Sequence, residues 1–168
     1  MIKILFVFLL GCAFWAFFSP KKNGLSTSEY SRSKLFYLGG IQINEADNKA
    51  WAGLLQACSM NTVEVTVYAT QGKWDSDSLR YDAEDLKVMD QIRTAKESGL
   101  KVVLILRVHL DHSFDENKFL WHGMLMPKDS STLTRWFGRY TSFAKKWAQI
   151  AQQEGVDVLG IGSEMNAL

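Results

Sequence analysis

Strand-like and helix-like segments alternate along this chain of 168 residues, and no other feature restricts its fold as strongly. The segment Val102–Leu106 is continuously apolar, which is typical of a parallel strand covered on both faces. Alternation of this kind favours an α/β fold with a parallel sheet and right-handed crossovers. The predicted strands cover about residues 34–41, 62–68, 101–108 and 156–164, and the predicted helices cover about 45–60, 83–98 and 131–154.

The connections between these segments differ strongly in length. Single glycines, Gly99 and Gly155, link two of the helices to the strands that follow them. The connections from strand to helix are long and cover residues 69–81 and 109–129. The long loops therefore gather at the carboxyl edge of the sheet, where parallel barrels and open parallel sheets carry their functional groups.

Local residue patterns predict the helix ends and the buried helix faces. Asn44 and Asp82 are the predicted N-caps of the first two helices. Cys58 is predicted to be a small buried residue without reactivity, and no disulfide with Cys12 is expected. The residues predicted to face the core are Trp51, Leu54, Leu55 and Cys58 in the first helix, and Leu133, Trp136, Phe137, Tyr140, Ala144, Trp147 and Ala151 in the third.

The N-terminus has the pattern of an export segment. Lys3 precedes the apolar run 4–18, which suits a signal peptide better than a spanning helix of ~20 residues. The sequence Leu9-Leu10-Gly11-Cys12 is similar to a bacterial lipoprotein box, and an uncleaved membrane anchor is the alternative. We predict a signal peptide or membrane anchor over residues 1–20, a linker over 21–33 and one folded domain over 34–168. The domain is therefore expected in the cell envelope, or secreted.

Charge and aromatic content indicate the class of partner. The net charge is +1 and there is no long basic run, so nucleic acid is not an expected partner. Trp74 and Trp121 lie in the long strand-to-helix loops, where indole rings can stack on the apolar faces of sugars. Each loop could instead fold down onto its own aromatic side chain. The sequence does not predict an oligomeric state.

Glu164 stands at the carboxyl tip of the fourth predicted strand. In parallel α/β barrels this is the position of catalytic groups, so the carboxylate is a candidate general acid/base. The alternative is an exposed carboxylate with no chemical role.

Polar residues also close the third predicted strand. Strand alternation places Arg107, His109 and Asp111 on one side, where they could bind sugar hydroxyls or tune a nearby carboxylate. A plain ion pair at the edge of the sheet is the alternative. His109, His112 and Asp111 do not match a known zinc spacing, so a metal site is not expected.

Several motifs, taken in order, resemble a known family. The order and spacing are similar to those of the first half of the family 113 glycoside hydrolases, barrel enzymes of clan A that act on β-mannan. The motifs are Gly99-Leu100-Lys101-Val102-Val103-Leu104, His109-Leu110-Asp111, Trp136-Phe137-x-x-Tyr140-x-x-Phe143 and Gly160-Ile161-Gly162-Ser163-Glu164.

The resemblance implies a (β/α)8 TIM-barrel type of fold, truncated here to about the first four strands. It implies a retaining glycosidase in which Glu164 is the acid/base, Ser163 contacts substrate and no cofactor is needed. The family's nucleophilic Glu follows strand seven, so the chain is expected to be an incomplete fragment without it. Where the family carries Pro and Thr, this chain has Val108 and Ser163. The alternative function is a non-catalytic, carbohydrate-binding lipoprotein on a degenerate half barrel.

Overall fold

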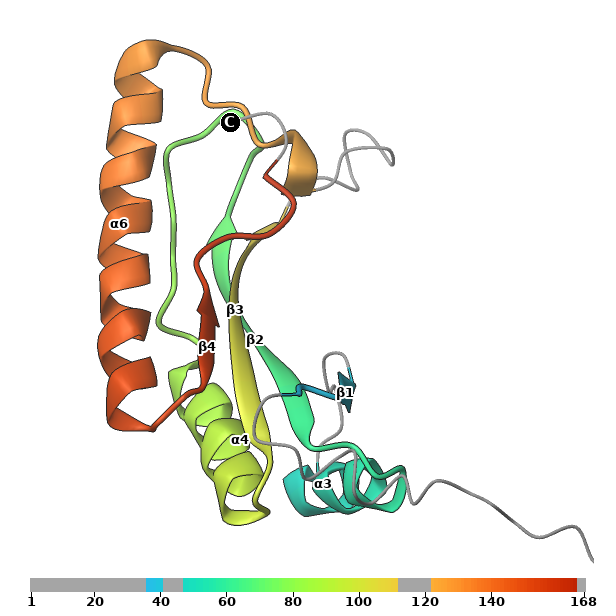
Figure 1. Cartoon of the computed structure of the whole chain (residues 1–168). Helices are drawn as coiled ribbons and strands as arrows, with labels where there is room; N and C mark the ends of the chain where they lie inside the picture. The colour runs from blue at the N-terminus through green and yellow to red at the C-terminus, as the bar shows by residue number, and fades with distance from the viewer. Residues whose placement is uncertain (1–35, 41–46, 112–121, 166–168) are drawn as a thin grey trace, which may run out of the picture.

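The computed structural model describes residues 36–40, 47–111 and 122–165, shown in Figure 1. The predicted export segment 1–20 with Cys12, the linker 21–33 and Trp121 lie outside these residues. The described elements are β1 (Gly39–Gly40), α3 (Asn48–Ala57), β2 (Thr62–Gln71), α4 (Asp85–Glu97), β3 (Lys101–Leu110), η1 (His122–Met124), α6 (Ser130–Gln153) and β4 (Val158–Gly160).

The four described strands form one parallel sheet in the order β1-β2-β3-β4, as the alternation predicts. Strands β2 and β3 pair along their whole length, from Thr62 opposite Lys101 to Gln71 opposite Leu110. Both strands therefore run further than predicted, whereas β4 is shorter. A bridge between Thr70 and Arg80 keeps the end of β2 extended, with N···O distances of 2.6 and 2.9 Å.

The two faces of the sheet differ in burial. Along β3 the side chains alternate between fully buried and partly exposed, and Val102, Leu104 and Leu106 are all 0% exposed. Helices α4 and α6 lie on the side that these residues face (Figure 1). The other face carries Arg107 and His109, so alternation along one strand separates the packed face from the candidate site.

Helix α6 supplies the largest buried side chains. Trp136, Phe143 and Trp147 are all 0% exposed, and Lys146 joins α6 to the start of α4 through a 2.5 Å bond to Asp85. The prediction for Phe137 was wrong: it is 47% exposed, because it lies about 100° around the helix from Trp136. None of the helices in the described ranges combines the length and apolar content that crossing a bilayer requires.

Helix α3 packs against the core through a different face from the one predicted. Trp51 and Ala52 are buried in α3, whereas Leu54 is 65% exposed and Cys58 is exposed. The predictions for Leu54 and Cys58 were therefore wrong. The buried stripe is displaced around the helix toward Ala52, and Cys58 caps the end of the helix, where the chain turns away toward β2.

Two of the three α-helices in the described part have an N-cap residue whose side chain accepts hydrogen bonds from the first turn. Asp47 accepts from the backbone N–H groups of Lys49 and Ala50 at 2.9 and 3.2 Å, so it caps α3, while the predicted cap Asn44 lies outside the described residues. The N-cap position of α4 is Glu84 and not Asp82, so that prediction was wrong. The carboxylate of Asp82 instead accepts from Lys146 of α6 at 2.8 Å.

Candidate active site

The candidate acid/base lies on the turn that follows β4. Glu164 has a backbone φ of +59°, a left-handed conformation that is uncommon for a residue other than glycine. Two glycines make room for this turn. A Cβ at Gly160 would lie 2.6 Å from Ile105 Cδ1, and one at Gly162 would lie 2.6 Å from Met165 Cε. The glycines of the motif Gly160-x-Gly162 thus let Ile105 and Met165 approach the backbone that precedes Glu164.

Arg107 on β3 contacts the carboxylate of Glu164. Its Nη2 atom lies 3.1 Å from Glu164 Oε1 and 3.5 Å from Ser163 Oγ. The two charged side chains are only partly exposed, at 22% for Arg107 and 41% for Glu164. The Nε atom of Arg107 is buried and has no hydrogen-bond partner among the described residues. The structure thus unites three of the predicted site residues.

His109 lies one pleat further along the same face of β3. It is exposed, and the ring of Tyr68 on β2 meets it edge-on, with 6.3 Å between the ring centroids. Register explains the contact, because Tyr68 pairs with Arg107 and Thr70 pairs with His109. Sequence reasoning missed Tyr68, although its even spacing from Glu64 along β2 would place it on this face.

Asp111 is engaged with the loop that follows β2. Its carboxylate forms an ion pair with Arg80, and its backbone N–H donates to the Gln71 carbonyl at 3.0 Å. The sequence left two roles open for Asp111, binding of sugar hydroxyls or an ion pair at the edge of the sheet. The ion pair is present. Sequence reasoning missed Arg80, because its place beside β3 depends on the bridge between Thr70 and Arg80.

A buried glutamine shapes the loop that carries Trp74. Gln71 is 0% exposed, and its Nε2 atom lies 2.8, 3.2 and 2.9 Å from the carbonyl oxygens of Lys73, Trp74 and Ser76. Its Oε1 atom accepts from Trp136 Nε1 at 2.7 Å. Trp74 itself is half-buried and packs against the core, and Met126 N–H donates to its carbonyl at 3.0 Å. The loop therefore holds Trp74 in a fixed place.

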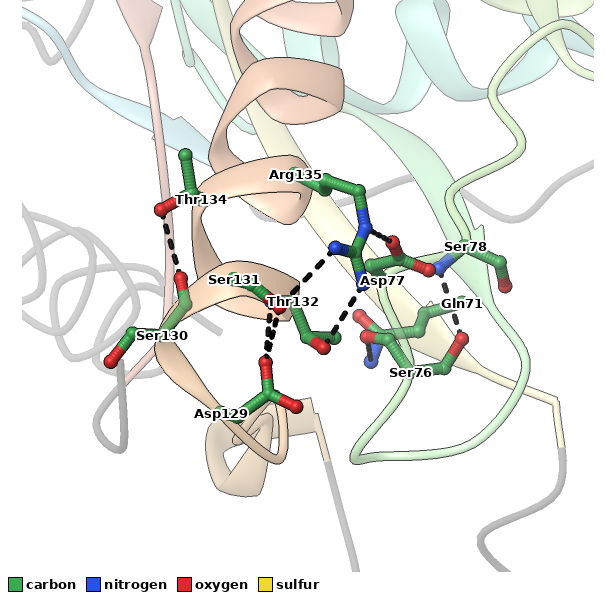
Figure 2. A network of polar contacts seen from close by, with 10 residues as sticks. All are labelled: Gln71, Ser76, Asp77, Ser78, Asp129, Ser130, Ser131, Thr132, Thr134 and Arg135. Carbon is green, nitrogen blue, oxygen red and sulfur yellow. Dashed lines mark hydrogen bonds and ion pairs between the residues drawn. The ribbon is translucent and has the colours of Figure 1, made fainter.

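The same loop is tied to the start of α6, as Figure 2 shows. Arg135 Nε donates to Asp77 at 2.6 Å, and this guanidinium lowers the pKa of Asp77 below its usual value. Asp129 caps α6 by accepting from the Thr132 N–H at 2.8 Å and from the Ser131 hydroxyl at 2.8 Å. These bonds lower the pKa of Asp129 to about 2. The loop after β2 and the first turn of α6 thus form one polar unit.

Within the described ranges, no cluster of three or more His, Cys, Asp or Glu side chains could hold a metal ion. Near the carboxyl edge, Arg107 pairs with Glu164 and Arg80 pairs with Asp111. Among the described residues, the candidate acid/base Glu164 therefore lies beside the guanidinium of Arg107.

Comparisons with known proteins identify a matching family. Residues 41–168 match the model of Glycoside Hydrolase Family 113. A search of curated protein sequences found no match.

Solved structures share the fold. The GH113 β-mannanase AaManA from Alicyclobacillus acidocaldarius, solved in complex with ManMIm, matches with a TM-score of 0.67 at 18% identity over 79% of this chain. A GH113 β-1,4-mannanase solved as a complex matches with a TM-score of 0.64 at 20% identity over 78% of this chain. Another GH113 β-1,4-mannanase structure gives a TM-score of 0.64 at 21% identity over 77%.

The matched regions cover 46–47% of those longer chains, so this chain spans about half the length of the relatives. Four parallel strands with helices on one side, matched to about half of such proteins, fit the expected (β/α)8 barrel truncated to its first part.

Proposed function

Because the chain belongs to Glycoside Hydrolase Family 113, we propose that it forms the acid/base-bearing part of a retaining glycoside hydrolase for β-linked polysaccharide such as β-mannan. The observation that carries the proposal is the position of Glu164. It follows β4 at the carboxyl edge of a parallel sheet, with its carboxylate 3.1 Å from Arg107 of the neighbouring strand. Functional groups in parallel barrels occupy this edge.

In the proposed reaction Glu164 protonates the glycosidic oxygen as the leaving group departs. A second carboxylate attacks the anomeric carbon, and Glu164 then removes a proton from the water that hydrolyses the covalent intermediate. The family resemblance puts that second carboxylate after strand seven, outside the four strands described here. In retaining enzymes the two carboxyl groups lie about 5–5.5 Å apart.

The neighbouring residues have separate proposed roles. Arg107 orients the Glu164 carboxylate through its Nη2 atom. Ser163 offers a hydroxyl 3.5 Å from the same guanidinium. His109 and Asp111 extend the polar edge and would bind further hydroxyls. Aromatic side chains would stack on sugar rings, namely Trp74, held by its loop, and Trp121.

The test compares Glu164→Gln with the wild-type protein, both expressed from the complete reading frame. We expect kcat/KM on β-mannan to fall by ~10²–10⁴, the usual contribution of general acid/base catalysis. Aryl β-mannosides with good leaving groups should lose much less in the first step, because they need little protonation. Glu97→Gln is the matched control, since Glu97 ends α4 at the opposite edge of the sheet.

A Glu164→Gln variant with unimpaired turnover of β-mannan would contradict the proposed role. Binding of mannooligosaccharides without turnover by the wild-type protein would favour the non-catalytic, carbohydrate-binding alternative instead.

We also propose export through residues 1–20, supported by Lys3 and the apolar run 4–18. Fractionation of cells that express a C-terminally tagged protein tests this, and a soluble cytoplasmic product would contradict it. Cys12→Ser separates the two forms of attachment. Loss of membrane association indicates a lipoprotein, whereas unchanged association indicates an uncleaved anchor.

A further inference from the structure

One of the motifs shared with family 113 lies on α6, and the proposed reaction gives no role to its tyrosine, Tyr140. Tyr140 lies in the middle of this helix and is 9% exposed. Its hydroxyl donates to the backbone carbonyl of Ile161 at 2.7 Å. Ile161 comes directly after β4 and three positions before Glu164. A side chain from the outer layer of the fold therefore holds the turn that carries the candidate acid/base.

We propose that Tyr140 is a positioning residue for Glu164, which it keeps within reach of Arg107 by fixing the backbone of the turn at Ile161. This inference rests on the proposed function of Glu164. It assigns to Tyr140 no contact with substrate, because the hydroxyl acts through the backbone that leads to the carboxylate.

The turn has few other anchors in the described part of the chain. The side chain of Ile161 is 68% exposed, so it does not pack the turn onto the core. Gly162 has no side chain, and a Cβ there would lie 3.7 Å from Tyr140 Oη, so the phenol lies directly beneath this part of the turn. Met165, which is partly buried against the core, is an anchor on the far side of Glu164. The hydrogen bond from Tyr140 thus fixes the part of the turn that precedes Glu164.

Tyr140 can serve as an anchor because its own ring is held firmly. It stacks on Trp136 with 5.0 Å between centroids and 7° between planes, and it meets Phe143 edge-on at 5.8 Å. Trp136 is 0% exposed and donates to Gln71 Oε1 at 2.7 Å. The loop after β2 and the turn after β4 are therefore both fastened to the same buried rings of α6.

Only the neutral phenol can donate this bond. Burial raises the pKa of Tyr140 to about 12, so the hydroxyl stays protonated wherever Glu164 could act as an acid. The geometric demand on Glu164 is strict, since a misplacement of about 1 Å by a change remote from the reacting atoms can lower a rate by ~10²-fold.

The test uses Tyr140→Phe, which keeps the ring and removes the hydroxyl. Tyr81→Phe is the matched control, because the ring of Tyr81 also packs on Phe143, at 5.4 Å, but lies outside the bonds that lead to Glu164. In the 168-residue chain, the carboxyl carbon of Glu164 is followed by NMR over a pH titration. We expect its resonance and titration midpoint to change in Tyr140→Phe and to stay unchanged in Tyr81→Phe.

The activity arm uses the protein expressed from its complete reading frame. We expect Tyr140→Phe to lower kcat/KM about tenfold or more on substrates with poor leaving groups, with little loss on those with good leaving groups. A residue that only stabilised the fold would not change the ratio of kcat/KM between substrates with poor and with good leaving groups. If Glu164→Gln loses activity while Tyr140→Phe alters neither the ratio nor the Glu164 resonance, the inference fails and the proposed function stands. If Glu164→Gln loses nothing, both fail.

A further measurement on the wild-type chain needs no substitution and tests the hydrogen bond on which the inference depends, even if Tyr140→Phe does not fold. The hydroxyl proton of Tyr140 should exchange slowly with water and show a nuclear Overhauser effect to the Gly162 amide. The exposed Tyr37, at 46%, provides the reference for fast exchange. Exchange at Tyr140 as fast as at Tyr37 would overturn the inference.

Discussion

Replacing Gln71 with leucine should destabilise the chain far more than the same change at an exposed glutamine. Gln71 is 0% exposed, and its side chain contacts three loop carbonyls and the indole N–H of Trp136. Leucine has a similar size but offers neither donor nor acceptor. The substitution therefore leaves a buried indole N–H without its acceptor and releases the loop that carries Trp74.

The magnitude follows from these contacts. An orphaned buried donor costs ~1–3 kcal/mol, and the two N–H donors lost from the loop carbonyls contribute ~1 kcal/mol each. Some of those carbonyls regain water, because Lys73 is exposed and Ser76 half-buried. We therefore expect a loss of ~2–4 kcal/mol in the free energy of unfolding.

Urea unfolding followed by circular dichroism measures this loss in the 168-residue chain. Gln56→Leu is the control, because Gln56 is exposed and its side chain donates to the Ser98 carbonyl at 2.7 Å, so we expect a change within ~0.5 kcal/mol. In the Gln71→Leu background, Trp136→Phe removes the orphaned donor and should cost ~1–2 kcal/mol less than in the wild type. Equal losses for the two glutamine variants, or strictly additive effects in the double variant, would refute the reasoning.

Three further predictions concern caps and titrating groups. Asp47→Ala should lower the free energy of unfolding by ~1 kcal/mol, because it removes the side-chain cap of α3, and urea titration would show a smaller change if the cap were unimportant. The carboxylate of Asp129 has its pKa lowered from 3.8 to about 2, so its stabilisation is complete above pH 3.8 and is lost as the pH falls through about 2. Unfolding at several acidic pH values should therefore show a weaker pH dependence for Asp129→Asn, and identical curves would contradict this. Burial raises the pKa of Tyr140 from 10.0 to about 12, so the stability that its neutral hydroxyl contributes is complete below pH 10 and is lost as the pH rises through about 12. The free energy of unfolding should therefore fall less steeply at alkaline pH in Tyr140→Phe than in the wild type.

Periodic features of the sequence predicted the layered part of the fold. The continuous apolar run in β3 predicted a parallel strand covered on both faces, and in the described residues the buried positions alternate with partly exposed ones. The short returns that contain Gly99 and Gly155 favour right-handed crossovers between adjacent parallel strands. Both glycines have positive φ values, of 74° and 66°, at the ends of α4 and α6. Strand order and the separation of the two faces of β3 follow from these local signals.

Contacts between distant residues could not be predicted in the same way. Gln71 bonds to backbone carbonyls, whose positions depend on the path of the loop, so no spacing in the sequence indicates its role. Phe137 and Phe143 are equally apolar, and only the direction in which α6 faces the sheet decides which of them is buried. Asp82 has the residue type of a cap, but Lys146, 64 positions away, binds its carboxylate.

The candidate site was partly predictable for the same reasons. Glu164 and Arg107 were each predicted as site residues from their place at the end of a strand, and parallel pairing of β3 with β4 brings the two strand ends together. Their contact spans 57 positions and needs the left-handed turn at Glu164, which the sequence does not specify. Trp74 was recognised as a loop aromatic, but its partial burial depends on Gln71 and the core.

The most direct test of the central claim is chemical rescue of a Glu164→Ala variant by azide. With an activated aryl β-mannoside, an acid/base variant still forms the glycosyl-enzyme, but no general base then helps water to attack it. Azide needs no such help, so we predict that it restores turnover and yields a β-mannosyl azide of retained configuration. Failure of azide to accelerate the variant, or a product of inverted configuration, would contradict the assignment of Glu164 as the acid/base of a retaining enzyme.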